Sequence, residues 1–207
     1  LPRPNAPHQV IVGECRFQGD IVFRHVTQSN YLGHFIVVWS GHEVEDLGDL
    51  YFDDELVPRD EDGIVTGKYA GYVGCNDHLG SPDQEADPNL MEHAPDLWTD
   101  KHRGRGRAYS YITLHNIPEI FPHGVPNMWR VGKGMKFADP RAVDPVAKTW
   151  TNNASLAIAG SAMVLLGPPA DGPAPAGFTA GAVAALGAGL SYAVYAVTAK
   201  GLLARVA

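Results

Sequence analysis

The sequence changes its solvent preference abruptly near Trp150, and this break constrains the fold more than any other feature. Up to Trp150 there are 22 Asp and Glu residues against 14 Lys and Arg residues, a net charge of −8. From Thr151 onward one acid faces two bases, a net charge of +1, and most residues are Ala, Gly, Leu or Val. We therefore expect an acidic soluble part followed by an apolar part, each suited to its own environment.

The acidic part is rich in strand signals, because β-branched and aromatic residues recur in short runs separated by turn residues. Residues 35–39 are apolar at both odd and even positions, which point to opposite faces of a strand. This pattern predicts a strand that is covered on both faces. The turn residues 18–20 predict a hairpin between the runs on either side of them, and Asp53-Asp54 predicts a second, small hairpin. The predicted strands are 9–17, 21–27, 31–40, 49–52, 55–57, 69–74, 107–115 and 127–137.

The last of these predicted strands, 127–137, places its apolar residues on one face. Lys133 interrupts this face, so Lys133 is expected at an edge. The residues concerned are Trp129, Val131, Met135 and Phe137.

One helix is predicted before Trp150, beginning at Asp87-Pro88, which is typical of an N-cap followed by proline at the first helical position. Apolar residues then recur at helical spacing, but Pro95 lacks the amide that a continuing helix needs, so a kink or two short helices are expected. The predicted fold class is α+β, a β-rich N-terminal domain with a small helical insert.

The apolar part predicts a C-terminal helix of transmembrane type. Residues 154–167 are uncharged but span only about 21 Å as a helix, too short for a bilayer core of about 30 Å. Residues 177–199 are uncharged and long enough, and Gly177 with Gly181 form the GxxxG spacing of close helix packing in lipid. A buried helix of a soluble protein is the alternative interpretation.

A search for chemistry in the sequence predicts no enzyme, no catalytic, cofactor-binding or metal-binding residues, and no cofactor. The nine histidines form no HExxH motif. Ten carboxylates lie between Glu43 and Asp62, but they lack the spacing of a calcium loop, so we interpret them as solvated hairpin tips. No P-loop, GxSxG or GxGxxG motif occurs in the chain.

The charge balance disfavours nucleic acid as a partner, because sequence-independent binding to phosphates needs cations. The one basic run, 101–107, is interpreted as a solvated turn that leads into a strand. Cys15 and Cys75 lie 60 positions apart without a CxxC motif, and we expect two free, partly buried thiols in a reducing compartment.

An ordered series of short motifs over residues 10–156 resembles the tail-tip attachment proteins of long-tailed phages, also called host-specificity or baseplate hub proteins. No single motif is diagnostic, but their order and the gaps between them are fairly specific. The motifs are Gly13-Glu14-Cys15-Arg16, 41–55, 69–73, His78-Leu79-Gly80, 105–109, Gly124-Val125-Pro126-Asn127, 132–141 and Trp150-Thr151-Asn152-Asn153.

The resemblance implies a structural role without catalysis in a phage tail tip or baseplate hub, of which this chain holds one segment. It implies other phage tail proteins as partners, a homotrimer in the assembled tail, and a location in the virion tail after assembly in the host cytoplasm.

The end of the chain resembles a fragment of an EamA-type drug/metabolite transporter, about one and a half of its helices. The alternative function is therefore an integral membrane protein fragment, with membrane contact and location through 177–199 if that helix inserts. The expected organisation is a linker at 1–9, the hub-like β-rich segment at 10–156 and the apolar tail at 157–207.

Overall fold

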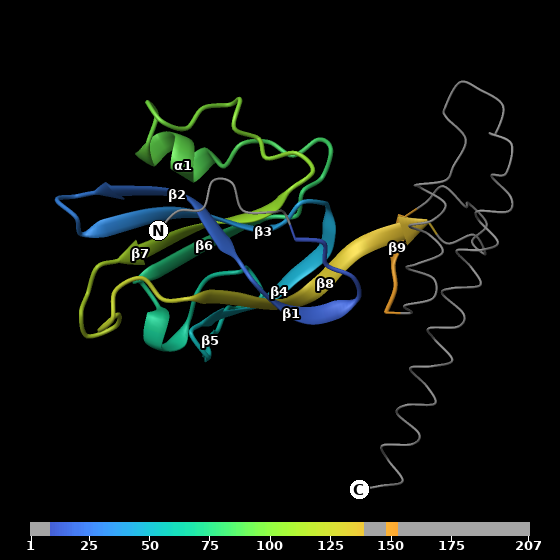
Figure 1. Ribbon diagram of the computed structural model, residues 1–207. Coiled ribbons are helices and arrows are strands. Elements are labelled where there is room, and N and C mark those ends of the chain that lie inside the picture. The colour runs from blue at the N-terminus through green and yellow to red at the C-terminus, as the bar shows by residue number, and fades with distance from the viewer. Residues whose placement is uncertain (1–8, 139–147, 153–207) are drawn as a thin grey trace, which may run out of the picture. The chain divides into compact units, whose positions relative to one another are not determined.

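The computed structural model describes residues 9–138 and 148–152 (Figure 1). The chain divides into two compact units, Leu1–Met135 and Lys136–Ala207. The elements in chain order are β1 (Glu14–Gln18), β2 (Asp20–Thr27), β3 (Leu32–Ser40), β4 (Val44–Phe52), β5 (Glu55–Val57), the 3-10 helix η1 (Gly67–Tyr69), β6 (Val73–His78), α1 (Pro88–His93), β7 (Ala108–His115), β8 (Met128–Ala138) and β9 (Lys148–Trp150).

The strands form two antiparallel sheets. Sheet I has the order β1-β8-β4-β5, and the last residues of β8 also pair with β9. Sheet II has the order β2-β3-β7-β6. The tight connection between β4 and β5 pairs Phe52 with Glu55, so the small hairpin predicted at Asp53-Asp54 is confirmed.

The two sheets of the first unit pack face to face as a β-sandwich, because both contribute alternate side chains to one hydrophobic core. Burial of such side chains supplies most of the stabilisation in a domain of this kind. The core residues are Ile11, Phe17, Phe35, Val37, Trp39, Val44, Leu47, Leu50, Phe52, Val57, Val65, Tyr69, Val73, Ala108, Ile112, Leu114 and Met128.

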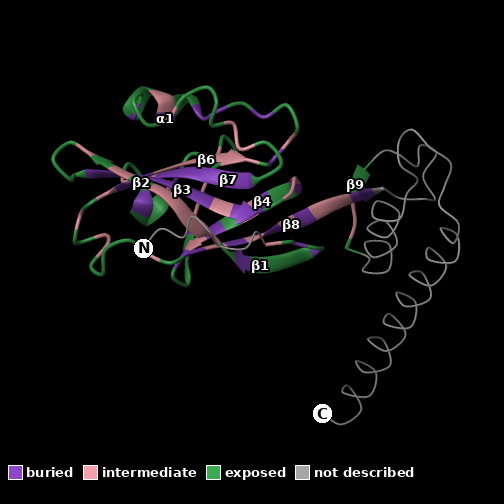
Figure 2. Cartoon of the chain, turned by 45° about the horizontal axis from the view of Figure 1, so that its top comes forward, coloured by how far each residue is buried: buried purple, intermediate pink, exposed green. Residues whose placement is uncertain are grey.

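The outer face of sheet II is covered as well, by α1 and the loop that follows it (Figure 2). Asp87 caps this helix, since its carboxylate accepts the Leu90 amide at 2.9 Å, and Pro88 occupies the first helical turn as predicted. Leu90 and Ala94 pack on the outward-facing Ile36, Tyr109 and Tyr111. The prediction that β3 is covered on both faces is therefore confirmed, because eight of its nine residues are buried.

The predicted hairpin at residues 18–20 is wrong. β1 pairs with β8 in sheet I, and β2 pairs with β3 in sheet II, so the chain changes sheets at this corner. Gly19 permits the crossing, since a Cβ atom there would overlap the side chains of Val37 and Trp39. The turn residues mark a change of chain direction, but residues close in sequence do not determine which strands β1 and β2 pair with.

The strand predicted at 69–74 begins later than expected. Tyr69 ends the 3-10 helix η1, and the extended segment starts at Val73. Gly67 and Gly71 have φ angles of +65° and +75°, values that suit turns and not strands.

The apolar face expected at 127–137 is not the face that points into the core over most of the strand, and Lys133 lies between β1 and β4 and not at an edge. Met128 and Arg130 are buried, whereas Trp129, Val131 and Met135 are only half-buried. Phe137 alone of the four predicted residues is buried. The parity is reversed because Arg130 finds polar partners inside the sandwich, described below, which a pattern based on hydrophobicity does not anticipate.

The predicted α+β class is wrong, because two antiparallel sheets dominate and α1 has only six residues. Among residues 9–138 and 148–152 there is no helix long and apolar enough to span a membrane. The transmembrane-like helix expected at 177–199 lies outside the described residues.

Candidate functional site

A buried arginine links the two sheets at the centre of the sandwich. Arg130 rises from β8 in sheet I, and its side chain is fully buried. Its guanidinium forms an ion pair with Asp77 of β6 and donates to the Ser110 hydroxyl of β7 at 3.0 Å. The same group donates to the Gly48 carbonyl at 2.9 Å and lies 5.3 Å from the ring centroid of Trp39.

Asp77 receives a second arginine, so that its carboxylate is held from two sides. Arg59 donates to Asp77 Oδ2 at 2.7 Å and also to the Gly48 carbonyl at 2.6 Å. The Ser110 hydroxyl donates to Asp77 Oδ1 at 2.5 Å and accepts from the Trp39 indole at 2.8 Å. Burial alone would raise the pKa of Asp77, but the two guanidinium groups hold it below its ordinary value.

The chemistry of this cluster fits a structural clamp. A guanidinium keeps its proton, and Asp77 is fully engaged as an acceptor, so neither group is available as a general acid or base. Cys75 beside them is not a thiolate nucleophile, because burial first and Asp77 second raise its pKa to about 12. Removing one partner of a buried ion pair is costly, so the cluster fixes the two sheets relative to each other.

Three of the nine histidines, scattered in the sequence, come together on the outer side of sheet II. The His34 ring lies with its centroid 6.0 Å from that of His25 and 5.0 Å from that of His93. Its two nitrogens bond to the Thr27 and Tyr111 hydroxyls at 2.8 and 2.7 Å. Burial, and then repulsion from the two neighbouring histidines, lowers the pKa of His34 to about 4, so the ring is neutral at pH 7.

Within the described residues no group of His, Cys, Asp or Glu side chains has the arrangement of a metal site. Each nitrogen of His34 is already hydrogen-bonded to a hydroxyl group, and its ring stacks on Tyr111. The cluster is therefore best described as aromatic packing with satisfied polar atoms.

A histidine and an aspartate pair at the start of α1. His78 contacts Asp87 at 2.9 Å and stacks on Tyr109 with the ring centroids 4.4 Å apart. Asp87 is fully buried, and it also accepts from Asn76 and from the Leu90 amide. Its bonds hold the helix to β6, which is a structural role.

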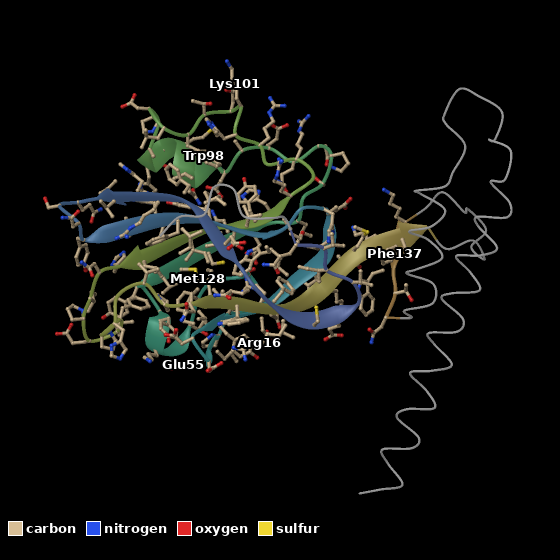
Figure 3. All side chains as sticks on the ribbon, in the orientation of Figure 1. Arg16, Glu55, Trp98, Lys101, Met128 and Phe137 are labelled. Atoms are coloured by element: carbon tan, nitrogen blue, oxygen red, sulfur yellow. The ribbon has the colours of Figure 1, made fainter. Side chains whose placement is uncertain are left out.

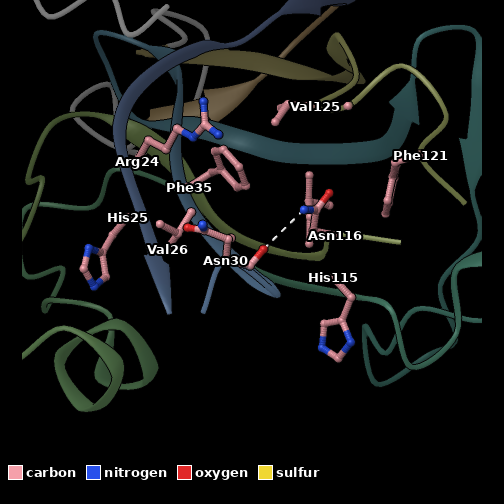
Figure 4. A pocket seen from close by; sticks show the side chains of 12 residues that line it. Arg24, His25, Val26, Asn30, Phe35, His115, Asn116, Phe121 and Val125 are labelled. Atoms are coloured by element: carbon pink, nitrogen blue, oxygen red, sulfur yellow. Dashed lines mark hydrogen bonds between the residues drawn. The ribbon is translucent and has the colours of Figure 1, made fainter. Parts of the chain in front are cut away.

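A groove of about 800 Å³ opens where the inner face of sheet II extends towards the loop between β7 and β8 (Figure 4). Core residues Phe35 and Leu114 belong to its apolar floor, and Phe121 and Val125 of the loop line it as well. The Arg24 guanidinium lies 5.9 Å from the centre of the Phe35 ring. None of the described residues that line the groove is acidic.

The charged segments singled out in the sequence lie on the surface of the sandwich, as Figure 3 shows for Glu55 and Lys101. The tips at Asp53-Asp54 and at 60–62 are exposed turns, as interpreted, but Glu45, Asp46 and Asp49 lie within β4 and Glu55 within β5, so these four carboxylates are exposed strand residues and not hairpin tips. The basic run 101–107 precedes β7 as predicted, and its Arg103 and Arg105 lie 3.4 and 3.0 Å from Glu85. Both cysteines are free, with Cys15 exposed and Cys75 half-buried.

No family model matches the sequence. A search of the curated proteins finds no match either. Among solved structures, a chain of the "virion of native gene transfer agent (GTA) particle" matches with a TM-score of 0.45 and 16% sequence identity. The match covers 70% of this chain and 31% of that chain, so the present chain spans less than a third of that protein's length.

Proposed function

We propose that this chain is a non-enzymatic structural segment of a phage tail tip or baseplate hub. The proposal is supported by the ordered series of motifs that resembles this class of protein and by the place of those motifs in the fold. Motif residues 41–55 include the whole of β4 and the turn after it, and residues 132–138 form the second half of β8. The motifs therefore coincide with the framework of the sandwich.

The observation that carries the proposal is that several motif glycines occupy positions where two stretches of backbone touch. Gly48 has a φ of +58° and lies against the Val131 carbonyl across the sheet. A Cβ on Gly132 would lie 2.6 Å from the Asp46 carbonyl oxygen, and one on Gly134 would overlap Ile11. Glycine at such positions serves close packing and not the binding of a substrate.

The buried polar groups support the same interpretation. Arg130 and Arg59 both pair with the Asp77 carboxylate between the sheets, where the three groups hold the fold and offer no reactive group. Other tail proteins are the proposed partners, with a homotrimer in the assembled tail and the virion as the location.

Immunogold electron microscopy of particles from cells that carry this gene tests the proposal. Antibodies raised against the full chain should label the distal end of the tail, and the purified chain should bind the tail-tube protein encoded beside it. Labelling of the capsid alone, or particles without any label, would contradict the tail-tip assignment.

A further inference from the structure

We propose that the groove beside Arg24 is a docking site for a second copy of this chain, which inserts its 60–64 loop. The groove supplies a cation and an apolar floor, and the loop supplies exposed acids next to an exposed apolar side chain. The inference rests on these two surfaces alone and not on the proposed tail function.

The groove presents positive charge on a chain whose net charge is −7. Arg24 supplies this charge, since it is exposed and forms no ion pair among the described residues. Beside Arg24 the side chains of Phe121, half-buried, and Val125, 40% exposed, offer apolar contact (Figure 4). An occupant of matching chemistry carries a carboxylate beside an aliphatic side chain.

The 60–64 loop has this chemistry in a fixed shape. Ile64 is 62% exposed, an unusual position for a large aliphatic residue, and Glu61 and Asp62 beside it form no ion pair among the described residues. The turn is held by the Asp60 carboxylate, which accepts the amides of Asp62 and Ile64 at 3.1 and 2.9 Å.

Main-chain hydrogen bonds reinforce this turn. The Asp60 amide donates to the Ile64 carbonyl at 3.0 Å, the Gly63 amide donates to the Asp60 carbonyl at 3.0 Å, and Arg59 bridges to Val65. A loop that is already ordered loses little conformational entropy on binding. The loop therefore acts as a preformed projection with two acids and one apolar tip.

A contact between the loop of one copy and the groove of the next is heterologous, since it joins two different surfaces. Each bound copy still offers a free groove and a free loop, so the contact extends to a closed ring or to a chain of copies. The ion pairs between Arg24 and the loop acids lie at the rim of such a contact, so the association should weaken as salt is added.

Sedimentation velocity of the full 207-residue chain, over about a hundredfold range of protein concentration, tests this contact because association follows mass action. The wild-type chain should sediment faster as its concentration rises. Arg24→Glu and Asp62→Arg should each weaken association at least about tenfold, and the double variant should recover most of the loss, because the swap restores opposite charges.

Matched controls separate this contact from general charge effects and from misfolding. Lys101→Glu and Asp96→Arg make the same changes of charge at exposed sites outside the groove and the loop, and they should leave association unchanged. Circular dichroism should report the same fold for all variants. Sedimentation that does not change with concentration, or association that persists unchanged in both single variants, would overturn the proposal. Single variants that weaken association without rescue in the double variant would overturn it too.

Discussion

The two sheets of the sandwich differ in what covers them. Sheet II is buried on both faces, by the core on one side and by α1 and its following loop on the other. In sheet I the inner face is buried, but in the described part of the chain no helix lies on its outer face, where Leu56 is 45% exposed and Trp129 is half-buried. The first arrangement favours rigidity, and the second leaves a surface on which substitutions cost little.

Two arginines on opposite faces of sheet I show the same contrast within one sheet. Arg130 points inward and is fully buried beside Asp77. Arg16 points outward, where its guanidinium lies 4.8 Å from the ring centroid of Trp129 and pairs with the exposed Asp54 at 2.7 Å. Removing one charge inside the sandwich costs far more stability than removing one on its surface, because the buried partner loses its counter-charge and water cannot replace it.

The largest effect is expected for Arg130→Ala, which leaves Asp77 buried with only Arg59 to offset its charge. The free energy of unfolding should fall by about 3–5 kcal/mol, measured by urea denaturation. The triple variant Arg59→Met, Arg130→Met and Asp77→Leu removes all three charges of the cluster and should recover most of this loss, because no charge is left without its partner. A loss below about 1 kcal/mol for Arg130→Ala would mean that the cluster behaves like a surface ion pair.

A matched pair of leucine truncations compares the covered face with the bare one. Leu90→Ala, on the side of α1 that faces sheet II, should cost about 2–5 kcal/mol, because this side chain is fully buried against the sheet. Leu56→Ala on the outer face of sheet I should change stability by about 0.5 kcal/mol or less. Equal costs in chemical denaturation would show that the two faces do not differ.

The pH dependence of stability should report the burial of His34 under α1. Its pKa in the folded chain is lowered to about 4 from 6.5, so the unfolded chain takes up a proton first as the pH falls. Stability is therefore lost as the pH falls from about 6.5 to about 4, by up to roughly 3 kcal/mol. In His34→Gln this part of the profile should be flatter, whereas an unchanged profile would assign the loss to other groups.

The smallest effect is expected for Arg16→Ala. Its contacts with Trp129 and Asp54 are exposed to water, so the free energy of unfolding should change by less than about 1 kcal/mol. Thermal unfolding in low and in high salt is a suitable measurement, since screening should reduce even this difference. A loss as large as that of Arg130→Ala would remove the contrast between the two faces.

The sequence was informative where a signal is local. The cap at Asp87 and the hairpin at Asp53-Asp54 depend on residues within a few positions of one another, and both were predicted. The strand at residues 35–39 was also predicted as covered on both faces, because its apolar residues occupy both parities.

The sequence failed where a residue's role depends on a distant partner. Trp129 and Val131 were expected to share one face of 127–137, but the buried position between them belongs to Arg130, because its partner Asp77 lies 53 positions earlier in the chain. In the same way Gly19 marks a corner and not a hairpin, because the partners of β1 and β2 lie in different sheets. The one signal of this buried cluster in the sequence was Arg130, an arginine between the apolar residues Trp129 and Val131 of a predicted strand.

Native-state hydrogen exchange on the full chain compares the two sheets most directly. Sheet II is covered on both faces, and β3 and β7 are its two central strands. Their amides should therefore exchange slowest and only through global unfolding. Amides of β5, a three-residue strand at the edge of sheet I, should exchange through local opening and be the least protected of the strand amides in the sandwich. If β3 and β7 instead exchanged as fast as β5, the covered sheet would not be the rigid framework of this protein.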